Sequence, residues 1–159
     1  MIRAGVVGGS GYAGGELVRL LLGHPEVDLQ YVTSRRHVGE FVHQLHPNLR
    51  KQTRLKFISP NGFEPADVLF LALPHGEAQQ QIETYAGVAP RLIDLSADFR
   101  LRDAAAYRRW YGSEHAAPAW LGQFVYGLPE LSRAELGAAK YASGVGCNAA
   151  ASILCLLPL

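Results

Sequence analysis

Glycines cluster near the start of the chain, directly after a short apolar segment. Residues 2–7 are mostly apolar and include β-branched side chains, and the heptapeptide GGSGYAG (residues 8–14) follows them. The cluster satisfies Gly-x-Gly-x-x-Gly from Gly9 and Gly-x-x-Gly-x-x-Gly from Gly8. Between a strand and a helix, such a loop lets backbone N–H groups approach a pyrophosphate. The pattern therefore predicts a dinucleotide site, and the alternative is an ordinary glycine-rich turn.

The end of the second apolar segment bears on the choice of dinucleotide. A predicted strand over residues 28–33 ends in the run Thr33-Ser34-Arg35-Arg36, and the nearest acid, Asp28, stands at its start. An NAD site usually carries an acid at the strand's end, where it binds the ribose 2′-hydroxyl. A hydroxyl and two guanidinium groups suit a 2′-phosphate instead. The sequence favours NADP, and the alternative is a solvated basic loop.

A cysteine near the end of the chain is the second candidate for chemistry. Cys147 follows a Gly-Val-Gly tripeptide and precedes helix-forming residues, which predicts a position at or near a helix N-terminus. There the helix dipole and free N–H groups favour the thiolate, which is the reactive form. A thiolate can attack an acyl carbon, and neighbouring amides can stabilise the oxyanion. The alternative is a small buried core cysteine, which we expect of Cys155 in its apolar run.

Strands that alternate with helices would position these candidates. We predict strands over residues 2–8, 28–33, 68–73 and 91–95, and helices over 14–22, 76–86 and 103–110. The continuous apolar run 68–73 is typical of a strand buried on both faces of a parallel sheet. Residues 35–56 are polar and irregular, so we expect a surface flap there. The alternation predicts a parallel α/β sheet.

Composition excludes several classes of function. The 159 residues suit one globular domain, with 48% hydrophobic and 18% charged residues. A formal charge of +1 gives no electrostatic reason to expect nucleic acid or an anionic membrane as partner. No apolar run is long enough to span a bilayer, and the first residues lack a signal peptide's features. Cys147 and Cys155 are too far apart along one predicted helix for a disulfide, and free thiols favour a cytoplasmic protein.

Five segments, in order along the chain, carry a resemblance to one enzyme family. They are GGSGYAGGEL from Gly8, HPNL from His46, LALPHG from Leu71, IDLSADFRL from Ile93 and YGLPEL from Tyr126. The chain resembles the N-acetyl-γ-glutamyl-phosphate reductases and their lysine-pathway relatives. Those relatives reduce aminoadipate 6-phosphate or glutamate 5-phosphate carried on a small amino-group carrier protein. IDLSADFRL together with LALPHG is far more specific than a glycine motif.

The resemblance implies a doubly wound, mostly parallel Rossmann-type domain that binds NADP(H). The residues that it assigns to the cofactor are Gly8, Ser10, Gly11, Tyr12, Ala13, Ser34, Arg35, Arg36, Pro74 and His75. It implies that Cys147 displaces phosphate from an acyl phosphate to form a thioester, whose reduction yields the semialdehyde. The family's acid/base histidine lies in a later substrate domain, and none of the six histidines here matches it. His75 is expected to line the nicotinamide edge.

The residues around Cys147 depart from the arginine-pathway pattern. Those members typically read Asn-Pro-Gly-Cys-Tyr-Pro, whereas this chain reads GVGCNA. The Cys-Asn-Ala form and the stretch VTSRR favour the carrier-dependent lysine branch, with the N-acetylated arginine-pathway substrate as the alternative. We expect residues 1–145 to form the NADP domain and 146–159 to begin a truncated α+β substrate domain. A homo-oligomer is expected at full length, and this chain alone is expected to be nearly inactive.

Two rival enzyme classes fail on spacing, and one non-catalytic interpretation remains open. A short-chain dehydrogenase needs Tyr-x-x-x-Lys, and none of the seven tyrosines has a lysine four residues later. His43-x-x-His46 lies in a polar segment without a third ligand at useful spacing, so no metal site is predicted. The open alternative is a nucleotide-binding fragment without catalysis. Four arginines could meet an acidic substrate or carrier, although such clusters are usually a solvated helix face: Arg100, Arg102, Arg108 and Arg109.

Overall fold

The computed structural model describes residues 1–157, and these fall into two compact units. Residues 1–73 and 83–92 form the first unit, and residues 74–82 with the chain from Ile93 onward form the second. This division differs from the predicted domain boundary after residue 145, which stays a prediction. The last part of the predicted substrate-domain segment, residues 158–159, lies outside the described residues.

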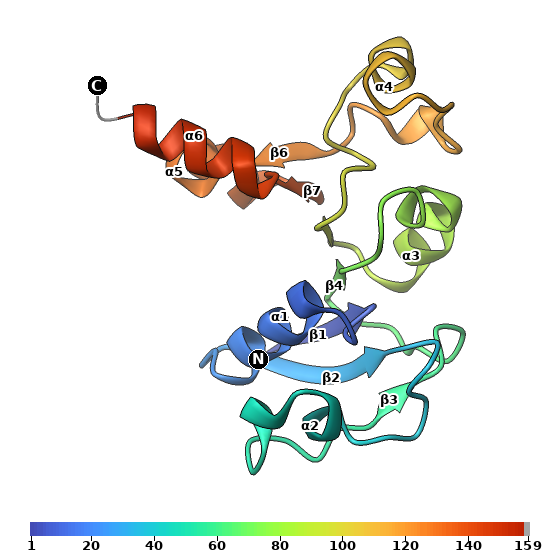
Figure 1. The fold of residues 1–159 in the computed structure, drawn as a ribbon, viewed down its shortest axis with the longest axis vertical. Helices are drawn as coiled ribbons and strands as arrows, with labels where there is room; N and C mark the ends of the chain where they lie inside the picture. Colours follow the sequence, from blue (N-terminus) through green and yellow to red (C-terminus); the bar gives the residue numbers. More distant parts are fainter. Residues whose placement is uncertain (158–159) are drawn as a thin grey trace. The chain divides into compact units, whose positions relative to one another are not determined.

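The first unit contains a parallel sheet with the strand order β3-β2-β1-β4 (Figure 1). Its strands are β1 (Ile2–Val7), β2 (Val27–Thr33), β3 (Phe57–Ile58) and β4 (Val68–Leu71). Ala4 of β1 pairs with Leu29 on one side and with Val68 on the other. The chain therefore runs outward from β1 to β3 and returns on the other side of β1. This reversal makes the C-terminal end of β1 the switch point of the sheet, where doubly wound folds bind their ligands.

The helix after β1 packs on this sheet through one face. In α1 (Tyr12–Leu22) the buried residues are Gly14, Gly15, Val18 and Leu21, at the spacing of a single helical stripe. Glu16 and Arg19 form an ion pair on the exposed face. Figure 1 shows α1 lying along β1 and β2. The predicted strand–loop–helix–strand opening is therefore confirmed, with β1, α1 and β2 each within about two residues of the expected bounds.

The segment between residues 35 and 56 is more ordered than we expected. It contains α2 (Val42–Leu45) and the 3₁₀ helix η1 (Pro47–Leu49). Val42 and Leu49 are completely buried, and Phe41 forms an isolated antiparallel bridge with Lys56. The prediction of an irregular surface flap is thus wrong for residues 42–49, because two apolar side chains anchor them in the core of the first unit.

The second unit is built on a parallel pair of strands and three helices. Its elements are η2 (Ala78–Gln80), α4 (Ala104–Tyr111), η3 (Pro118–Trp120), β6 (Val125–Gly127), α5 (Pro129–Ala138), β7 (Tyr141–Gly144) and α6 (Cys147–Leu156). Two further elements, α3 (Ile82–Val88) and β5 (Leu92–Asp94), carry the chain between the units. Asp103 caps α4 by accepting the N–H of Ala106 at 2.8 Å, and Gly112 ends the helix with a φ of 74°. The predicted helix over 103–110 is confirmed.

Two further expectations are wrong. The expected helix over 76–86 is η2 followed by α3, because buried Asp98 accepts the N–H groups of Gly76 and Gln79 and so holds a turn there. Cys155 was expected in the core but is exposed. The described part of the chain buries no residue of α6. No helix among residues 1–157 is long and apolar enough to cross a membrane.

Candidate active site

The glycine loop joins β1 to α1 at the switch point of the sheet. Gly8 has a φ of 84°, and a Cβ on it would lie 2.5 Å from the carbonyl oxygen of Ala72. A Cβ on Gly14 would lie 2.6 Å from the carbonyl oxygen of Gly8. Gly11, in contrast, would place a Cβ in open space. These are the three duties of a dinucleotide-binding loop, namely a tight turn, an open approach for the pyrophosphate and close packing of the helix. The structure therefore uses the spacing Gly8-x-x-Gly11-x-x-Gly14.

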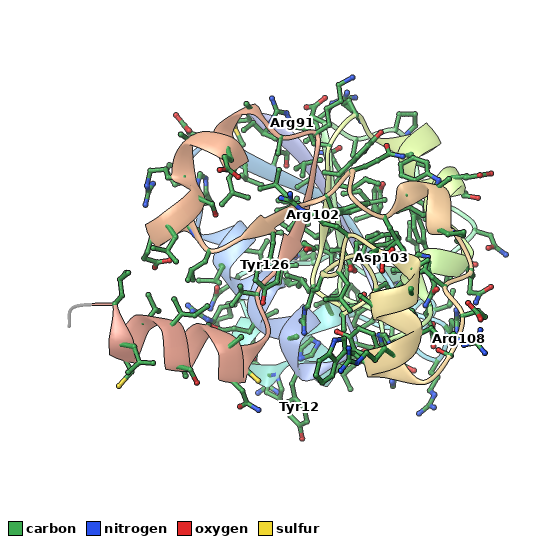
Figure 2. All side chains as sticks on the ribbon, turned by 90° about the horizontal axis from the view of Figure 1, so that it is seen from above. Tyr12, Arg91, Arg102, Asp103, Arg108 and Tyr126 are labelled. Atoms are coloured by element: carbon green, nitrogen blue, oxygen red, sulfur yellow. The ribbon has the colours of Figure 1, made fainter. Side chains whose placement is uncertain are left out.

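The N-terminus of α1 faces this opening without a capping side chain. Gly11 is the N-cap residue and has no side chain to accept the N–H groups of the first turn. Those groups need an outside partner, and an anion suits them because they lie at the positive end of the helix. Tyr12 is fully exposed and points away from the ribbon (Figure 2). Ser10 is half-buried and Ala13 is exposed. The loop thus fits a pyrophosphate.

Thr33, at the end of β2, holds the first two glycines of the loop. Its Oγ1 accepts the N–H of Gly8 at 3.2 Å, and its carbonyl accepts the N–H of Gly9 at 3.0 Å. The side chain is 1% exposed. The end of β2 and the glycine loop are therefore one connected structure.

The turn that follows Thr33 carries the residues predicted to bind a 2′-phosphate. Ser34 is buried, and its Oγ accepts the N–H groups of Arg36 and His37, each at 3.3 Å. Arg35 and Arg36 are exposed on this turn. The structure thus brings the predicted residues 8–13 and 34–36 together in the first unit, with the Ser34 hydroxyl shaping the turn.

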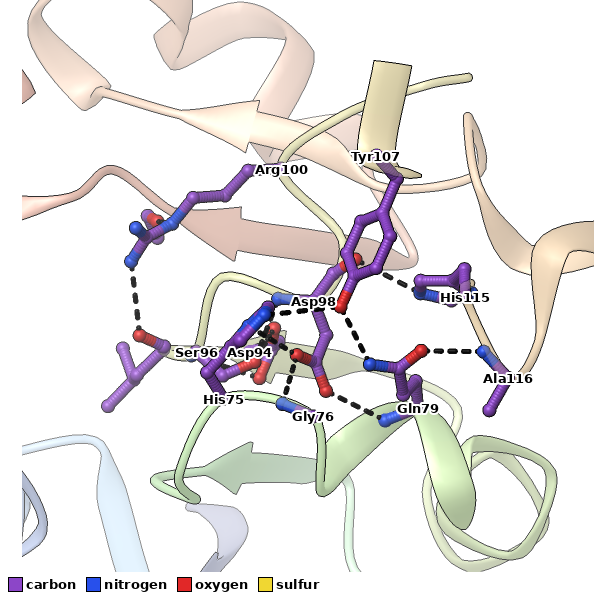
Figure 3. A network of polar contacts seen from close by, with 12 residues as sticks. His75, Gly76, Gln79, Asp94, Ser96, Asp98, Arg100, Tyr107, His115 and Ala116 are labelled. Carbon is purple, nitrogen blue, oxygen red and sulfur yellow. Dashed lines mark hydrogen bonds and ion pairs between the residues drawn. The ribbon is translucent and has the colours of Figure 1, made fainter. Parts of the chain in front are cut away.

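A buried carboxylate organises the polar contacts of the second unit (Figure 3). Asp98 is completely buried and accepts the backbone N–H groups of Gly76 at 2.6 Å and Gln79 at 3.0 Å. Nδ1 of His75 lies 2.9 Å from Oδ1 of Asp98. Because both oxygens of Asp98 accept hydrogen bonds, Nδ1 of His75 carries a hydrogen. Asp98 therefore fixes both the turn after the LALP segment and the tautomer of the half-exposed His75 ring.

Tyr107 closes the other side of this network. Its hydroxyl lies 3.3 Å from Nε2 of His75 and accepts a hydrogen bond from the Gln79 side-chain amide at 2.8 Å. The carbonyl of that amide accepts the N–H of Ala116 at 2.6 Å, which fixes its orientation. Burial raises the pKa of Tyr107, so the phenol remains neutral. His75 is thus held at both ring nitrogens.

Two more titratable groups lie beside Asp98. Nδ1 of His115 accepts the N–H of Ala117 at 3.1 Å, so Nε2 donates to the Asp98 carbonyl, also at 3.1 Å. Burial lowers the pKa of His115, which favours the neutral ring. Burial also raises the pKa of Asp94 to about 6, although the N–H and hydroxyl of Ser96 oppose this by donating to the Asp94 carboxyl group.

Cys147 is the first residue of α6, as the sequence predicted, and its side chain is exposed. Arg100 lies against the backbone that leads to it. Nε of Arg100 donates to the Gly144 carbonyl at 3.0 Å, and a Cβ on Gly146 would lie 2.8 Å from Nη1. Arg100 is half-buried, unlike the exposed Arg102, Arg108 and Arg109. For Arg100, the expectation of a solvated helix face is therefore wrong.

The structure adds four polar residues to those that the sequence singled out. They are Gln79, Asp98, Tyr107 and His115, which belong to the hydrogen-bonded network that holds His75. Pro74 is exposed and precedes His75 at the start of that unit. Asp98 could have been found from the sequence, because it closely follows the predicted buried strand over residues 91–95. A carboxylate buried at such a position needs hydrogen-bond donors around it.

Comparisons with known proteins agree with this geometry. A [LysW]-L-2-aminoadipate 6-phosphate reductase of Deinococcus radiodurans is 49% identical over 154 residues, which cover 97% of this chain and 44% of that protein. A Thermomicrobium roseum protein provisionally named for the same activity is 55% identical, over 100% of this chain and 45% of its own. The N-acetyl-gamma-glutamyl-phosphate reductase of Thiobacillus denitrificans is 45% identical, over 100% of this chain and 47% of its own. The chain thus spans less than half the length of these relatives.

A solved structure and a family model give the fold and the family. The aspartate semialdehyde dehydrogenase II of Vibrio cholerae, complexed with ASA, superposes with a TM-score of 0.68 at 13% identity, over 99% of this chain and 46% of that one. This likeness confirms the expected Rossmann-type fold. The model of the semialdehyde dehydrogenase NAD binding domain matches residues 3–139. With its glycine loop at the switch point of a parallel sheet, the chain belongs to the semialdehyde dehydrogenase NAD-binding domain family, whose cofactor is a nicotinamide dinucleotide.

Proposed function

We propose that this chain carries the NADP(H) site and the nucleophile of an acyl-phosphate reductase that makes a semialdehyde. The observation that carries the proposal is the glycine loop, which is open at Gly11 and ends at the uncapped N-terminus of α1. The proposal is also supported by the similarity of this whole chain to part of two reductases that are named for phosphorylated acyl substrates. The nicotinamide cofactor, when bound, supplies the hydride for the reduction.

NADP(H), rather than NAD(H), is the form that the chain's own residues favour. Arg36 is exposed on the turn that Ser34 shapes, and Thr33 joins this turn to the glycine loop. A guanidinium can bind a 2′-phosphate through two parallel hydrogen bonds. No carboxylate follows β2 closely enough to bind a free 2′-hydroxyl, since the next acid in the chain is Glu40.

Cys147 is proposed to form the covalent intermediate. Its thiolate attacks the acyl carbon, the bond from that carbon to the phosphate oxygen breaks, and phosphate leaves with the bonding electrons. Hydride addition to the thioester then gives a thiohemiacetal, whose C–S bond breaks to release the semialdehyde and the thiolate. The net reaction consumes one proton. The first-turn N–H groups of α6 lie next to Cys147 and can stabilise the oxyanions.

Arg100 and His75 are proposed to support this chemistry. Arg100 packs against Gly144 and Gly146, immediately before the nucleophile, so its charge lies at the end of the helix where an anionic substrate would arrive. Two of its donors bond carbonyl oxygens, which fixes the plane of the guanidinium. His75, held by Asp98 and Tyr107, is proposed with Pro74 to line the nicotinamide.

The proposed substrate is a carrier-bound aminoadipate 6-phosphate or glutamate 5-phosphate. The Deinococcus radiodurans and Thermomicrobium roseum proteins carry LysW in their names and are 49% and 55% identical to this chain. The Thiobacillus denitrificans reductase, named for an N-acetylated substrate, is 45% identical. The higher identity to the two proteins with LysW in their names favours the carrier-bound substrate, as does the Cys-Asn-Ala sequence at the nucleophile. The N-acetylated substrate is the alternative. The homo-oligomer and the cytoplasmic location remain predictions.

Calorimetric titration with NADPH and NADH, under identical salt, tests the cofactor site. The wild type is expected to prefer NADPH, and Arg36→Ala is expected to weaken NADPH binding about tenfold or more while leaving NADH binding unchanged. NADPH oxidation by the intact protein, with the carrier-bound acyl phosphate, is expected to disappear in Cys147→Ser. Binding of neither dinucleotide would refute the proposal. NADPH binding without Cys147-dependent turnover would favour the alternative of a non-catalytic nucleotide-binding module.

A further inference from the structure

A histidine from the segment after β2 lies against the glycine loop. Nε2 of His46 lies 2.8 Å from the carbonyl oxygen of Gly9. A carbonyl can only accept, so Nε2 carries the hydrogen and donates it. His46 joins α2 to η1, and the buried residues Val42 and Leu49 anchor these two helices on either side of it. The backbone of His46, which carries the donating imidazole, is therefore held in a fixed position.

The ring of His46 also explains a glycine that the dinucleotide motif does not require. A Cβ on Gly15 would overlap the His46 ring, lying 2.5 Å from Nδ1 and closer still to Cε1. The Phe57 ring contacts the same imidazole edge-on, with centroids 6.4 Å apart. His46 is thus packed between α1 and β3 while its Nε2 bonds the loop.

The bond to Gly9 has a consequence for the next residue. In a planar trans peptide the carbonyl of one residue and the N–H of the next point in opposite directions. Holding the Gly9 carbonyl toward His46 therefore holds the Ser10 N–H on the opposite side of the loop. Ser10 is one of the residues proposed to contact the cofactor.

We propose that His46 is a positioning residue for the cofactor, because it fixes the Gly9–Ser10 peptide so that the Ser10 N–H faces the pyrophosphate. The proposal rests on the proposed dinucleotide site. The proposal gives two residues of the segment after β2 different functions in cofactor binding. The turn at Arg36 recognises the 2′-phosphate, and His46, ten residues later, orients the loop for the pyrophosphate that both dinucleotides share.

The test compares His46→Ala, His46→Gln and His43→Ala in the intact protein by titration with NADPH and with NADH. His46→Ala is expected to weaken binding of both dinucleotides by the same factor, about three- to tenfold, as for one lost hydrogen bond. The NADPH preference should not change. His46→Gln, whose amide can still donate, should recover most of the affinity. His43 is the matched control, since it is also half-buried but stacks on Phe41.

Two further measurements separate positioning from folding. Circular dichroism melting identifies any variant that is unfolded. Amide hydrogen exchange of Gly9, whose N–H donates to the Thr33 carbonyl at 3.0 Å, should be faster without cofactor in His46→Ala than in the wild type and in His46→Gln. Wild-type affinity and exchange in a folded His46→Ala would overturn the inference and leave the proposed function intact. A wild type that binds neither dinucleotide would overturn both.

Discussion

At the scale of single residues, Asp98 is the acceptor on which the polar contacts of the second unit converge. Its Oδ1 accepts from Gly76 and His75, and its Oδ2 accepts from Gln79. An asparagine side chain has an oxygen at only one of these two positions. At the other position its NH₂ group would face an N–H donor that then has no acceptor. A buried N–H without a partner costs about 1–3 kcal/mol.

Asp98→Asn is therefore expected to lower the free energy of unfolding by about 1–3 kcal/mol, measured by urea denaturation at neutral pH. Asp103→Asn makes the same chemical change at an exposed N-cap, where asparagine is as good as aspartate, and should cost less than about 0.5 kcal/mol. Equal effects at the two positions would contradict the role assigned to Asp98.

The raised pKa of Asp94 predicts a pH-dependent stability. Its pKa is about 6 in the folded chain, against an ordinary value of 3.8, because the carboxyl group is buried. The folded state then binds the proton more tightly, so stability falls as the pH rises from about 4 to about 6 and stays lower above that. The full effect is about 3 kcal/mol.

Asp94→Asn cannot ionise, so it should lose this dependence. The difference in unfolding free energy between Asp94→Asn and the wild type should shift in favour of the variant by about 2–3 kcal/mol between pH 4 and pH 7. His115, whose pKa is lowered, opposes the trend in both proteins and cancels in the difference. A constant difference across this range would show that Asp94 titrates normally.

At the scale of elements, the strand–loop–helix unit assigns different duties to its glycines, and one substitution can separate them. Serine suits the N-cap position of Gly11, and its Cβ would lie in open space. Serine at Gly14 would press its Cβ against the Gly8 carbonyl.

We therefore expect Gly11→Ser to keep the wild-type melting temperature but to lose NADPH affinity, because its side chain occupies the approach to the loop. Gly14→Ser should be destabilised by about 1–3 kcal/mol. Calorimetric titration and circular dichroism melting measure the two effects. Full NADPH affinity in Gly11→Ser would contradict the proposed path of the pyrophosphate.

The elements that the sequence predicted well are those with strong apolar periodicity. β1, α1, β2 and β4 lie close to their expected bounds, because burial on one or both faces imposes a pattern on neighbouring residues. The η2 turn was missed because its geometry depends on Asp98, about twenty residues later. α2 and η1 were missed because two apolar side chains within a polar segment anchor them.

The candidate site was predictable in its local parts. The glycine loop, the turn at Arg36 and the position of Cys147 at the start of α6 follow from neighbouring residues. His46 and Arg100 were not assigned their contacts, because each bonds backbone carbonyls far along the sequence, at Gly9 and Gly144 respectively. No residue pattern identifies which carbonyl a side chain will reach.

At the scale of the whole molecule, the two units divide the proposed duties. The first unit holds the glycine loop and the turn at Arg36, and the second holds the His75 network and Cys147. The chain spans less than half the length of its curated relatives, so the activity for which each relative is named belongs to a longer protein. Turnover should therefore be assayed in the intact protein.

The positions of the two tryptophans determine which unit can be monitored by tryptophan fluorescence. Both tryptophans of the chain, Trp110 and Trp120, belong to the second unit. Trp110 is 71% exposed, whereas the Trp120 ring lies 5.4 Å from the Tyr141 ring. Tryptophan emission therefore senses the surroundings of the second unit, chiefly through Trp120. The glycine loop itself contains no tryptophan, so backbone circular dichroism is the signal that follows its variants.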